Sequence, residues 1–249
     1  MSPSRLVPSI LVLAGAVMLA AGCSTAPSSP APTSTATGSG ASGPAQPDER
    51  SAGDIEVAWL DGGRSFAVVT WGSSSAGCRP VADGVTGKGQ NVDVTLADPP
   101  GDAAEACTDD LVPRAAIVGV PEGVDAAQDV EVRVTYGDVI DDESLDGFVG
   151  ALEPGLSTGD QGPSAGWFDD RGLVLLTWGS SSCQPQVERI EQSGAGATVT
   201  FADIDGVCTM DFAPRTTVVV LDQEPADDDS PFTLTLQGGG LDGTVDVLG

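Results

Sequence analysis

The sequence WGSSSCQP occupies residues 178–185, and the closely similar WGSSSAGCRP occupies residues 71–80. Further along the chain, CTMDFAPR at residues 208–215 matches CTDDLVPR at residues 107–114. The two pairs occur in the same order at an offset of about 100 residues, which exceeds the period of solenoid repeats. The repeat therefore predicts two tandem copies of one small domain.

The tripeptide Leu-Asp-Gly also occurs twice, at residues 145–147 and 241–243. We interpret it as a third repeated position near the end of each copy. Copy 1 is predicted to span residues 51–152, and copy 2 residues 165–249. Residues 153–164, which are rich in Pro and Gly, are predicted to link the two copies.

Four cysteines lie in the two copies, and four cysteines allow three pairings. The repeat selects one of them, because Cys78 and Cys107 occupy the same places in copy 1 as Cys183 and Cys208 in copy 2. We therefore predict the disulfides Cys78–Cys107 and Cys183–Cys208, each contributing about 3–4 kcal/mol in the chain-entropy account. The long spacings and the absence of His disfavour a structural metal site.

The N-terminal region is typical of a bacterial lipoprotein signal. Arg5 precedes an apolar stretch at residues 6–21, and the sequence LAAGC ending at Cys23 resembles a lipobox, although Ala20 stands where Leu is usual. We predict a signal peptide at residues 1–22 and a lipidated Cys23. Several buried acyl chains would hold the protein to the extracytoplasmic face of the cell membrane, so the membrane is a predicted partner.

A tether is predicted between this anchor and the first copy, at residues 23–50. Residues 24–47 consist only of Ser, Thr, Ala, Pro, Gly and Gln, a composition that cannot bury enough apolar surface to fold. As a flexible coil the segment would span about 25–30 Å.

Short apolar runs with period-two alternation, bounded by Gly, Pro and Asp, predict an all-β fold. Each copy is expected to be a small antiparallel β-sandwich-like domain, or half-open barrel, of about six strands with one internal disulfide. The strands are predicted at residues 55–60, 65–71, 91–96, 115–120 and 130–136 in copy 1, and at 166–168, 173–178, 197–201, 216–221, 232–237 and 244–248 in copy 2.

One strand in each copy is apolar on both faces, at residues 66–69 and 173–176. Such a strand is either covered on both sides within its own domain or packed against the other copy. The sequence leaves both alternatives open, and with them the question of whether the copies pack together.

Charge excludes several classes of partner. The chain has 37 acidic and 10 basic residues, a formal net charge of −27, and Lys88 is its only Lys. Nucleic acid is therefore not expected as a partner, because phosphate binding requires clustered basic residues. The absence of His removes the commonest general base and metal ligand. We expect no cofactor and no enzymatic activity.

Several side chains allow both a chemical and a structural interpretation. The Ser triplets could supply a nucleophile, but with no His as base they favour a turn. The tryptophans are expected in the core rather than on a ligand platform. Arg114 and Arg215 could bind an anionic ligand, but an ion pair with Asp110 and Asp211 is the simpler expectation. Acidic clusters at residues 138–143, 169–170 and 227–229 could bind Ca²⁺, but none matches an EF-hand loop.

The two motifs of copy 2, WGSSSCxP and CTxDxxPRT, resemble those of a group of uncharacterised actinobacterial exported proteins and lipoproteins. Copy 1 departs from the pattern, because Ala76 and Gly77 are inserted and Ala115 replaces the final Thr. The resemblance covers most of both copies and implies a high-GC Gram-positive source and an envelope location. The group has no assigned activity, so the resemblance implies no catalytic residue.

Function is expected where the copies differ, because shared residues mainly build the fold. A disulfide-bound loop at residues 97–106 is longer than its counterpart at 202–207. Loops on a rigid β scaffold commonly carry recognition. We expect an envelope partner to contact Asp98, Asp102 and Glu105, and the region around Lys88. The leading hypothesis is a non-catalytic binding or scaffolding module; the alternatives are a Ca²⁺-binding adhesion module and a carboxylate-dependent hydrolase.

Overall fold

Strands account for almost all of the regular structure in this computed structural model, which describes residues 50–99, 107–148, 150, 161–225 and 231–249. The strands of copy 1 are β1 (Ile55–Leu60), β2 (Ser65–Gly72), β3 (Val81–Lys88), β4 (Asn91–Ala97), β5 (Val112–Gly119), β6 (Val130–Tyr136) and β7 (Val139–Leu145). Two short 3-10 turns, η1 (Asp61–Gly63) and η2 (Ala76–Cys78), interrupt them. The predicted signal peptide, Cys23 and residues 24–49 of the tether lie outside the described residues.

Copy 2 repeats the seven strands of copy 1 in the same order. They are β8 (Ser164–Trp167), β9 (Gly172–Gly179), β10 (Val187–Gln192), β11 (Gly196–Phe201), β12 (Ala213–Val220), β13 (Thr233–Gln237) and β14 (Gly243–Leu248). The all-β prediction is confirmed, as are the disulfides Cys78–Cys107 and Cys183–Cys208, whose Cα atoms lie 5.8 and 5.6 Å apart.

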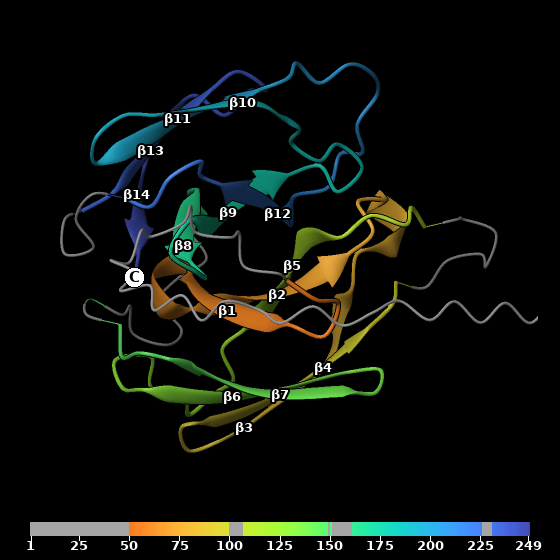
Figure 1. Cartoon of the computed structure of the whole chain (residues 1–249), viewed down its shortest axis with the longest axis vertical. Helices are drawn as coiled ribbons and strands as arrows, with labels where there is room; N and C mark the ends of the chain where they lie inside the picture. The colour runs from red at the N-terminus through yellow and green to blue at the C-terminus, as the bar shows by residue number, and fades with distance from the viewer. Residues whose placement is uncertain (1–49, 100–106, 149, 151–160, 226–230) are drawn as a thin grey trace, which may run out of the picture. The chain divides into compact units, whose positions relative to one another are not determined.

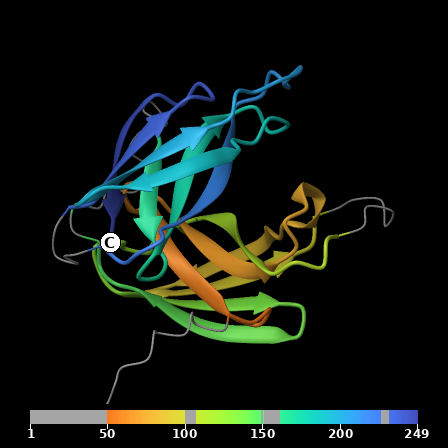
Figure 2. The same cartoon turned by 45° about the horizontal axis from the view of Figure 1, so that its top comes forward.

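The strands of each copy form two arrays. In copy 1 these are the separate sheets β1-β2-β5 and β3-β4-β6-β7. In copy 2 the equivalent arrays, β8-β9-β12 and β10-β11-β13-β14, are joined into one seven-stranded sheet because β14 pairs with β8. Figure 1 shows β1, β2 and β5 beside β8, β9 and β12, and Figure 2 shows the same arrangement after rotation.

Not every strand pair is antiparallel, which corrects the sequence-based expectation. β4 pairs with β6 in parallel, and β11 pairs with β13 in the same way. The cause is topological, because β5 and β12, the intervening strands, belong to the opposite array. Parallel neighbours cannot be joined by a hairpin and need a crossover of this kind.

Three strands were missed from the sequence. Most residues of β3 and β10 are exposed or only partly buried, and β3 contains Gly84 and Gly87, so neither strand shows a clear alternation. β7 lacks apolar alternation because Asp141 and Glu143 lie on its inward face, opposite Val134 and Val132. The interpretation of Leu-Asp-Gly as a repeated position is also wrong. Residues 145–147 follow β7 from its last residue onward, whereas residues 241–243 lead into β14.

The two-sided apolar strands are explained by a third core between the copies. On β2, Phe66 and Val68 belong to the core of copy 1, whereas Ala67 and Val69 pack in the shared core. On β9, Leu173 and Leu175 belong to the core of copy 2, and the intervening residues face copy 1. The shared core contains Ala58, Leu60, Ala67, Val69, Trp71, Ala115, Phe168, Val174 and Leu176. The two copies therefore pack together, which the sequence left open.

Polar contacts also cross this junction. The Thr216 hydroxyl donates to the Ala115 carbonyl at 2.7 Å, and the Asp61 N–H donates to the Ser164 hydroxyl at 2.8 Å. Gly166 approaches the main chain of Trp59 so closely that a Cβ atom there would lie 2.0 Å from the Trp59 carbonyl oxygen. The junction is therefore a tightly fitted interface rather than a loose contact.

Candidate functional site

A buried arginine organises the disulfide end of each copy. Arg114, only 8% exposed, donates from Nη1 to the Cys78 carbonyl at 2.8 Å and from Nη2 to the Trp71 carbonyl at 3.4 Å. In copy 2, Arg215 donates in the same way to the carbonyls of Cys183 at 2.9 Å and Trp178 at 3.1 Å. Each arginine thus ties the strand that carries it to the disulfide and to the end of the Trp-Gly strand.

The expected ion pairs of these arginines with Asp110 and Asp211 are wrong. The guanidinium groups of Arg114 and Arg215 donate to main-chain carbonyls, and both aspartates instead accept hydrogen bonds from the Ser-rich turns. The reason is register: Arg114 lies opposite Thr70 within the sheet, and its guanidinium extends over Gly72.

The glycine of the Trp-Gly motif makes this arrangement possible. A Cβ atom at Gly72 would lie 2.7 Å from Cζ of Arg114, and one at Gly179 would lie 2.7 Å from Cζ of Arg215. The two halves of the repeat, WG and PR, are therefore one structural unit, because a side chain in the first would displace the guanidinium of the second.

The Ser-rich turn of copy 1 binds the Cys-Thr-x-Asp segment. Ser73 Oγ lies 2.8 Å from Thr108 Oγ1 and accepts from the Thr108 N–H at 2.9 Å, while the Ser74 N–H donates to Asp110 at 3.0 Å. The Thr108 hydroxyl donates to the same carboxylate. Hydrogen bonds from Thr108 and Ser74 lower the pKa of Asp110 to about 2, so the carboxylate is ionised at neutral pH.

Copy 2 has the same network. Ser180 Oγ lies 2.7 Å from Thr209 Oγ1, and the Ser181 N–H donates to Asp211 at 3.2 Å. Hydrogen bonds from Ser181 and Thr209 lower the pKa of Asp211 to about 2. Hydroxyls from both Ser triplets are thus engaged in holding the turn, as the structural interpretation predicted, although their partners come from a distant segment as well as from the local backbone.

The tryptophans belong largely to packed surfaces. Trp59 and Trp71 are both 6% exposed, and the Trp59 indole N–H donates to the Asp146 carbonyl at 2.7 Å. Trp71 meets Phe168 of copy 2 edge-on, with ring centroids 6.1 Å apart. Trp178 instead stacks on Phe212 at 5.9 Å, next to the disulfide of copy 2.

The segment around the second disulfide exposes four large apolar side chains, and we name it the apolar loop (residues 203–212). Their exposed fractions are 41% for Ile204, 100% for Val207, 104% for Met210 and 62% for Phe212. The disulfide at Cys208 and the bonds of Thr209 and Asp211 to the Ser-rich turn hold this loop on the scaffold. The sequence contains a signal for this loop, because Met210 stands where copy 1 has the charged Asp109.

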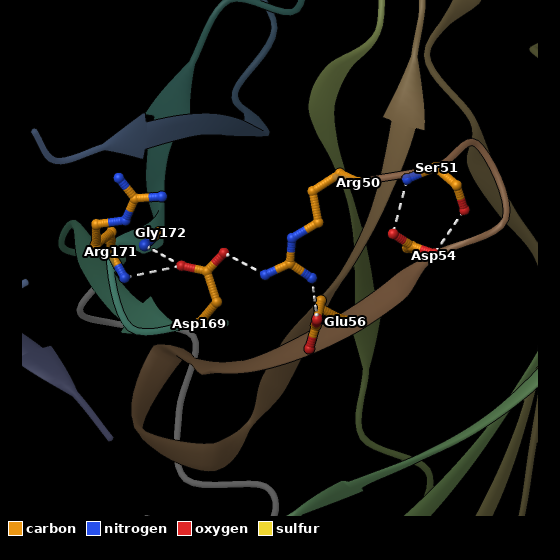
Figure 3. A network of polar contacts seen from close by, with 7 residues as sticks. All are labelled: Arg50, Ser51, Asp54, Glu56, Asp169, Arg171 and Gly172. Carbon is orange, nitrogen blue, oxygen red and sulfur yellow. Dashed lines mark hydrogen bonds and ion pairs between the residues drawn. The ribbon is translucent and has the colours of Figure 1, made fainter. Parts of the chain in front are cut away.

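A cationic side chain at the start of the described chain joins the two copies. Arg50 donates to Glu56 of β1 at 2.6 Å and to Asp169 of copy 2 at 2.9 Å (Figure 3). Asp169 also accepts from the Arg171 N–H at 2.9 Å and from the Gly172 N–H (Figure 3). The Arg50 guanidinium lies 4.9 Å above the Trp71 ring. The last residue of the predicted tether is therefore fixed across the junction.

Acidic side chains gather between β1 and β7. Burial, together with the charges of Glu56 and Asp141, raises the pKa of Glu143 to about 7. Burial also raises the pKa of Glu56, against the opposing effect of Arg50. A raised carboxyl pKa is one of the features that the hydrolase alternative requires.

A cleft of about 190 Å³ lies between the copies, and we name it the interface cleft. Its walls come from β5, β12 and the segments that follow the first cysteine of each copy, and they include Arg79, Arg114, Pro185 and Thr217. None of its lining residues is Asp or Glu. The cleft therefore lacks the carboxylate pair that a glycosidase-like hydrolysis needs.

The predicted acidic clusters have other partners in the part of the chain that the structure describes. Asp142 pairs with Arg133 at 2.9 Å, and Asp169 takes part in the Arg50 network. Residues 227–229 lie outside the described residues. No group of three or more Asp, Glu, Cys or His suited to a metal ion occurs among the described side chains.

The predicted recognition loop is only partly described. Asp98 accepts a hydrogen bond from the Tyr136 hydroxyl at 2.6 Å, whereas Asp102 and Glu105 lie outside the described residues. Lys88 is exposed at the end of β3. A partner contact at these positions stays a prediction.

Comparison of the chain with protein-family models, with curated proteins and with solved structures found no match. In the described parts of the chain, no helix has the length and apolar character needed to cross a membrane.

Proposed function

We propose that this chain is a lipid-anchored envelope protein whose paired β copies form a non-catalytic binding module, and that the apolar loop docks a partner protein. The observation that carries the proposal is the exposure of Val207 and Met210, both fully solvent-accessible on a loop held by a disulfide. Exposed apolar side chains that cluster on a rigid loop are typical of interaction sites.

The charges around the loop define the partner. Asp203 and Asp205 are exposed beside Ile204 and Val207, in a chain of net charge −27. A bilayer with anionic headgroups would be repelled by these carboxylates, and so would a second copy of the chain. The complementary surface is an apolar pocket bordered by Lys or Arg on another envelope protein.

The apolar loop can bind a partner with little loss of conformational entropy. Thr209 and Asp211 bond to the Ser-rich turn, so the intervening Met210 projects from a main chain that is already fixed. A side chain presented in this way loses little further conformational entropy on binding. Methionine also adapts to irregular apolar pockets.

The test is crosslinking in cells followed by co-purification with the full chain. The variant Met210→Asp installs the residue of copy 1 at a fully exposed position, so we expect unchanged folding and a loss of the crosslinked partner. Ile140→Thr, which removes an apolar side chain that is 58% exposed on β7, is the matched control. Equal partner recovery with both variants would contradict docking at the apolar loop.

Two further arms separate the alternatives. Replacement of residues 98–105 by the copy 2 sequence tests the contact predicted for copy 1, and loss of partner in that arm alone would move the site there. The variant Cys23→Ala tests the anchor, and we expect it to release the protein from the membrane fraction. Mature protein that still fractionates with membrane after this change would contradict the lipid anchor.

A further inference from the structure

The interface cleft concentrates positive charge on an acidic protein. It contains two arginines and no carboxylate among its lining residues, although acidic residues outnumber basic ones by 37 to 10 in the chain. A random sample of this surface would be acidic. A cleft with the opposite charge therefore points to a ligand that is negatively charged.

Arg79 lines this cleft without a partner among the residues that the structure describes. Its side chain is partly buried, and no hydrogen bond or ion pair joins it to another described residue. Burial lowers the pKa of Arg79, the charge of Arg114 lowers it further, and no carboxylate of the described residues opposes the two effects. Placing two guanidinium groups together costs free energy unless an anion compensates.

Arg114 is held in place for such a role. Its Nη atoms donate to the carbonyls of Cys78 and Trp71, while its Nε is buried without a hydrogen-bond partner. Thr217 lines the same cleft, and its Oγ1 is also buried without a partner. Buried polar atoms are normally satisfied. Because Arg215 Nε is also unsatisfied although it does not line the cleft, the group specific to the cleft is the Thr217 hydroxyl, which can donate to a bound oxyanion. Tyr136, whose pKa burial raises against the opposing charge of Arg114, donates to Asp98.

We infer that the interface cleft binds the oxyanion group of a small ligand, a carboxylate or a phosphate, between Arg79 and Arg114. The volume of about 190 Å³ is below that of drug-sized pockets, so an end group rather than an extended ligand fits. Pro113 and Pro185 supply apolar walls for the carbon that carries the group. The site is independent of the docking proposed for the apolar loop.

The copies differ at the decisive residue, which provides the variant. Gln184 follows Cys183 in copy 2, where Arg79 follows Cys78 in copy 1. Arg79→Gln therefore replaces the cation with the residue that the scaffold already accepts. Arg133→Gln is the control, because it removes one positive charge from an exposed pair on β6 outside the cleft.

The test is calorimetric titration of the purified full chain with inorganic phosphate and, separately, with acetate, at constant ionic strength in chloride. We expect saturable binding of at least one anion, weakened about tenfold or more by Arg79→Gln and unchanged by Arg133→Gln, as the loss of a charged hydrogen bond requires. Binding of phosphate would identify the ligand's end group as a phosphate, and binding of acetate would identify it as a carboxylate. Arg79→Lys, which keeps the charge, should retain part of the affinity if Arg79→Gln lowers the melting temperature. No heat with either anion, or equal weakening by Arg79→Gln and Arg133→Gln, would overturn the inference.

Discussion

The two copies share a scaffold but close it differently. In copy 2, the last strand β14 pairs with the first strand β8, through Val247 with Ala165 and Leu248 with Gly166. In copy 1, β7 and β1 lie side by side but belong to separate sheets. On β7, Glu143 faces inward opposite Val132 of β6. The equivalent residue of copy 2 is Val245, which is buried opposite Leu234 of β13. We call the unpaired boundary between β7 and β1 the open seam. It occurs in the copy that has a carboxylate at this core-facing position.

The two copies have the same contacts at the disulfide end. They differ at the open seam, the apolar loop and the interface cleft. The arginine, the glycine beneath it and the Ser-Thr-Asp network recur with nearly the same distances. By contrast, Met210 of the apolar loop stands where copy 1 has Asp109, and Arg79 of the interface cleft stands where copy 2 has Gln184. The two copies therefore share the frame and differ at the surfaces that we propose for binding.

The largest expected effect comes from removing one disulfide. Replacing Cys183 and Cys208 with Ala should lower the free energy of unfolding by about 3–4 kcal/mol, because the unfolded chain regains the entropy of the loop. Replacing Cys78 and Cys107 should have a nearly equal effect, since the bridges span 25 and 29 residues. Thermal unfolding followed by circular dichroism measures both. We expect a single transition in each variant, because the shared core couples the copies; two separated transitions would show that they unfold independently.

Gly166→Ala is the next largest change, and it tests the fit between the copies. The new methyl group would lie 2.0 Å from the main-chain oxygen of Trp59, which cannot swing aside as a side chain can. We expect a loss of about 2–3 kcal/mol in chemical denaturation. The equivalent residue of copy 1 is Ala58, and Ala58→Gly should cost only about 1 kcal/mol. Similar losses in both variants would mean that the junction is not tightly fitted.

The sequence predicted the parts of the fold that follow from short-range pattern. Alternation located β4, β6 and β11, and the repeat paired the cysteines without ambiguity. It could not locate β10, because a strand with one partner and little burial shows no alternation. It also gave no means to choose between the two explanations of residues 66–69, since a strand covered by its own domain and one covered by the other copy have the same composition.

The candidate sites were less accessible from sequence for a physical reason. Arg114 donates to main-chain carbonyls. Every residue has a carbonyl, so this contact cannot be recognised from residue types, and the sequence suggested a nearby Asp instead. The interface cleft brings Arg79 and Thr217 together although they are far apart in the chain. The apolar loop could have been found, because the difference between Met210 and Asp109 is visible once the copies are aligned.

Removing the hydroxyl from each of two adjacent threonines on β12 is expected to change stability in opposite directions. Thr216→Val removes the hydroxyl that donates to the Ala115 carbonyl at 2.7 Å, and should lower stability by about 1–1.5 kcal/mol. Thr217→Val removes a hydroxyl that is buried without a partner, and should raise stability by up to about 1 kcal/mol in the absence of a ligand. Urea denaturation of both variants measures the pair. A loss of stability in Thr217→Val would indicate that its hydroxyl has a partner in solution.

The smallest expected effect concerns the open seam and depends on pH. Because burial raises the pKa of Glu143 to about 7 from its ordinary value of 4.5, the folded state binds this proton more tightly than the unfolded state. The stabilising contribution is present below about pH 4.5 and is lost as the pH rises through 7. Stability should therefore fall across this window, by about 1 kcal/mol once solvent screening of a partly exposed group is taken into account.

Glu143→Val, which installs the residue of copy 2, isolates this contribution. The variant should be more stable than the parent chain at pH 8 and nearly equal to it at pH 5, because only the ionised carboxylate opposes burial. Ser144→Val, on the solvent face of the same strand, is the control and should show no such dependence on pH. Asp110 and Asp211 do not interfere, because their pKa values of about 2 place their titration below the window. A pH-independent gain in Glu143→Val would attribute the open seam to shape rather than to charge.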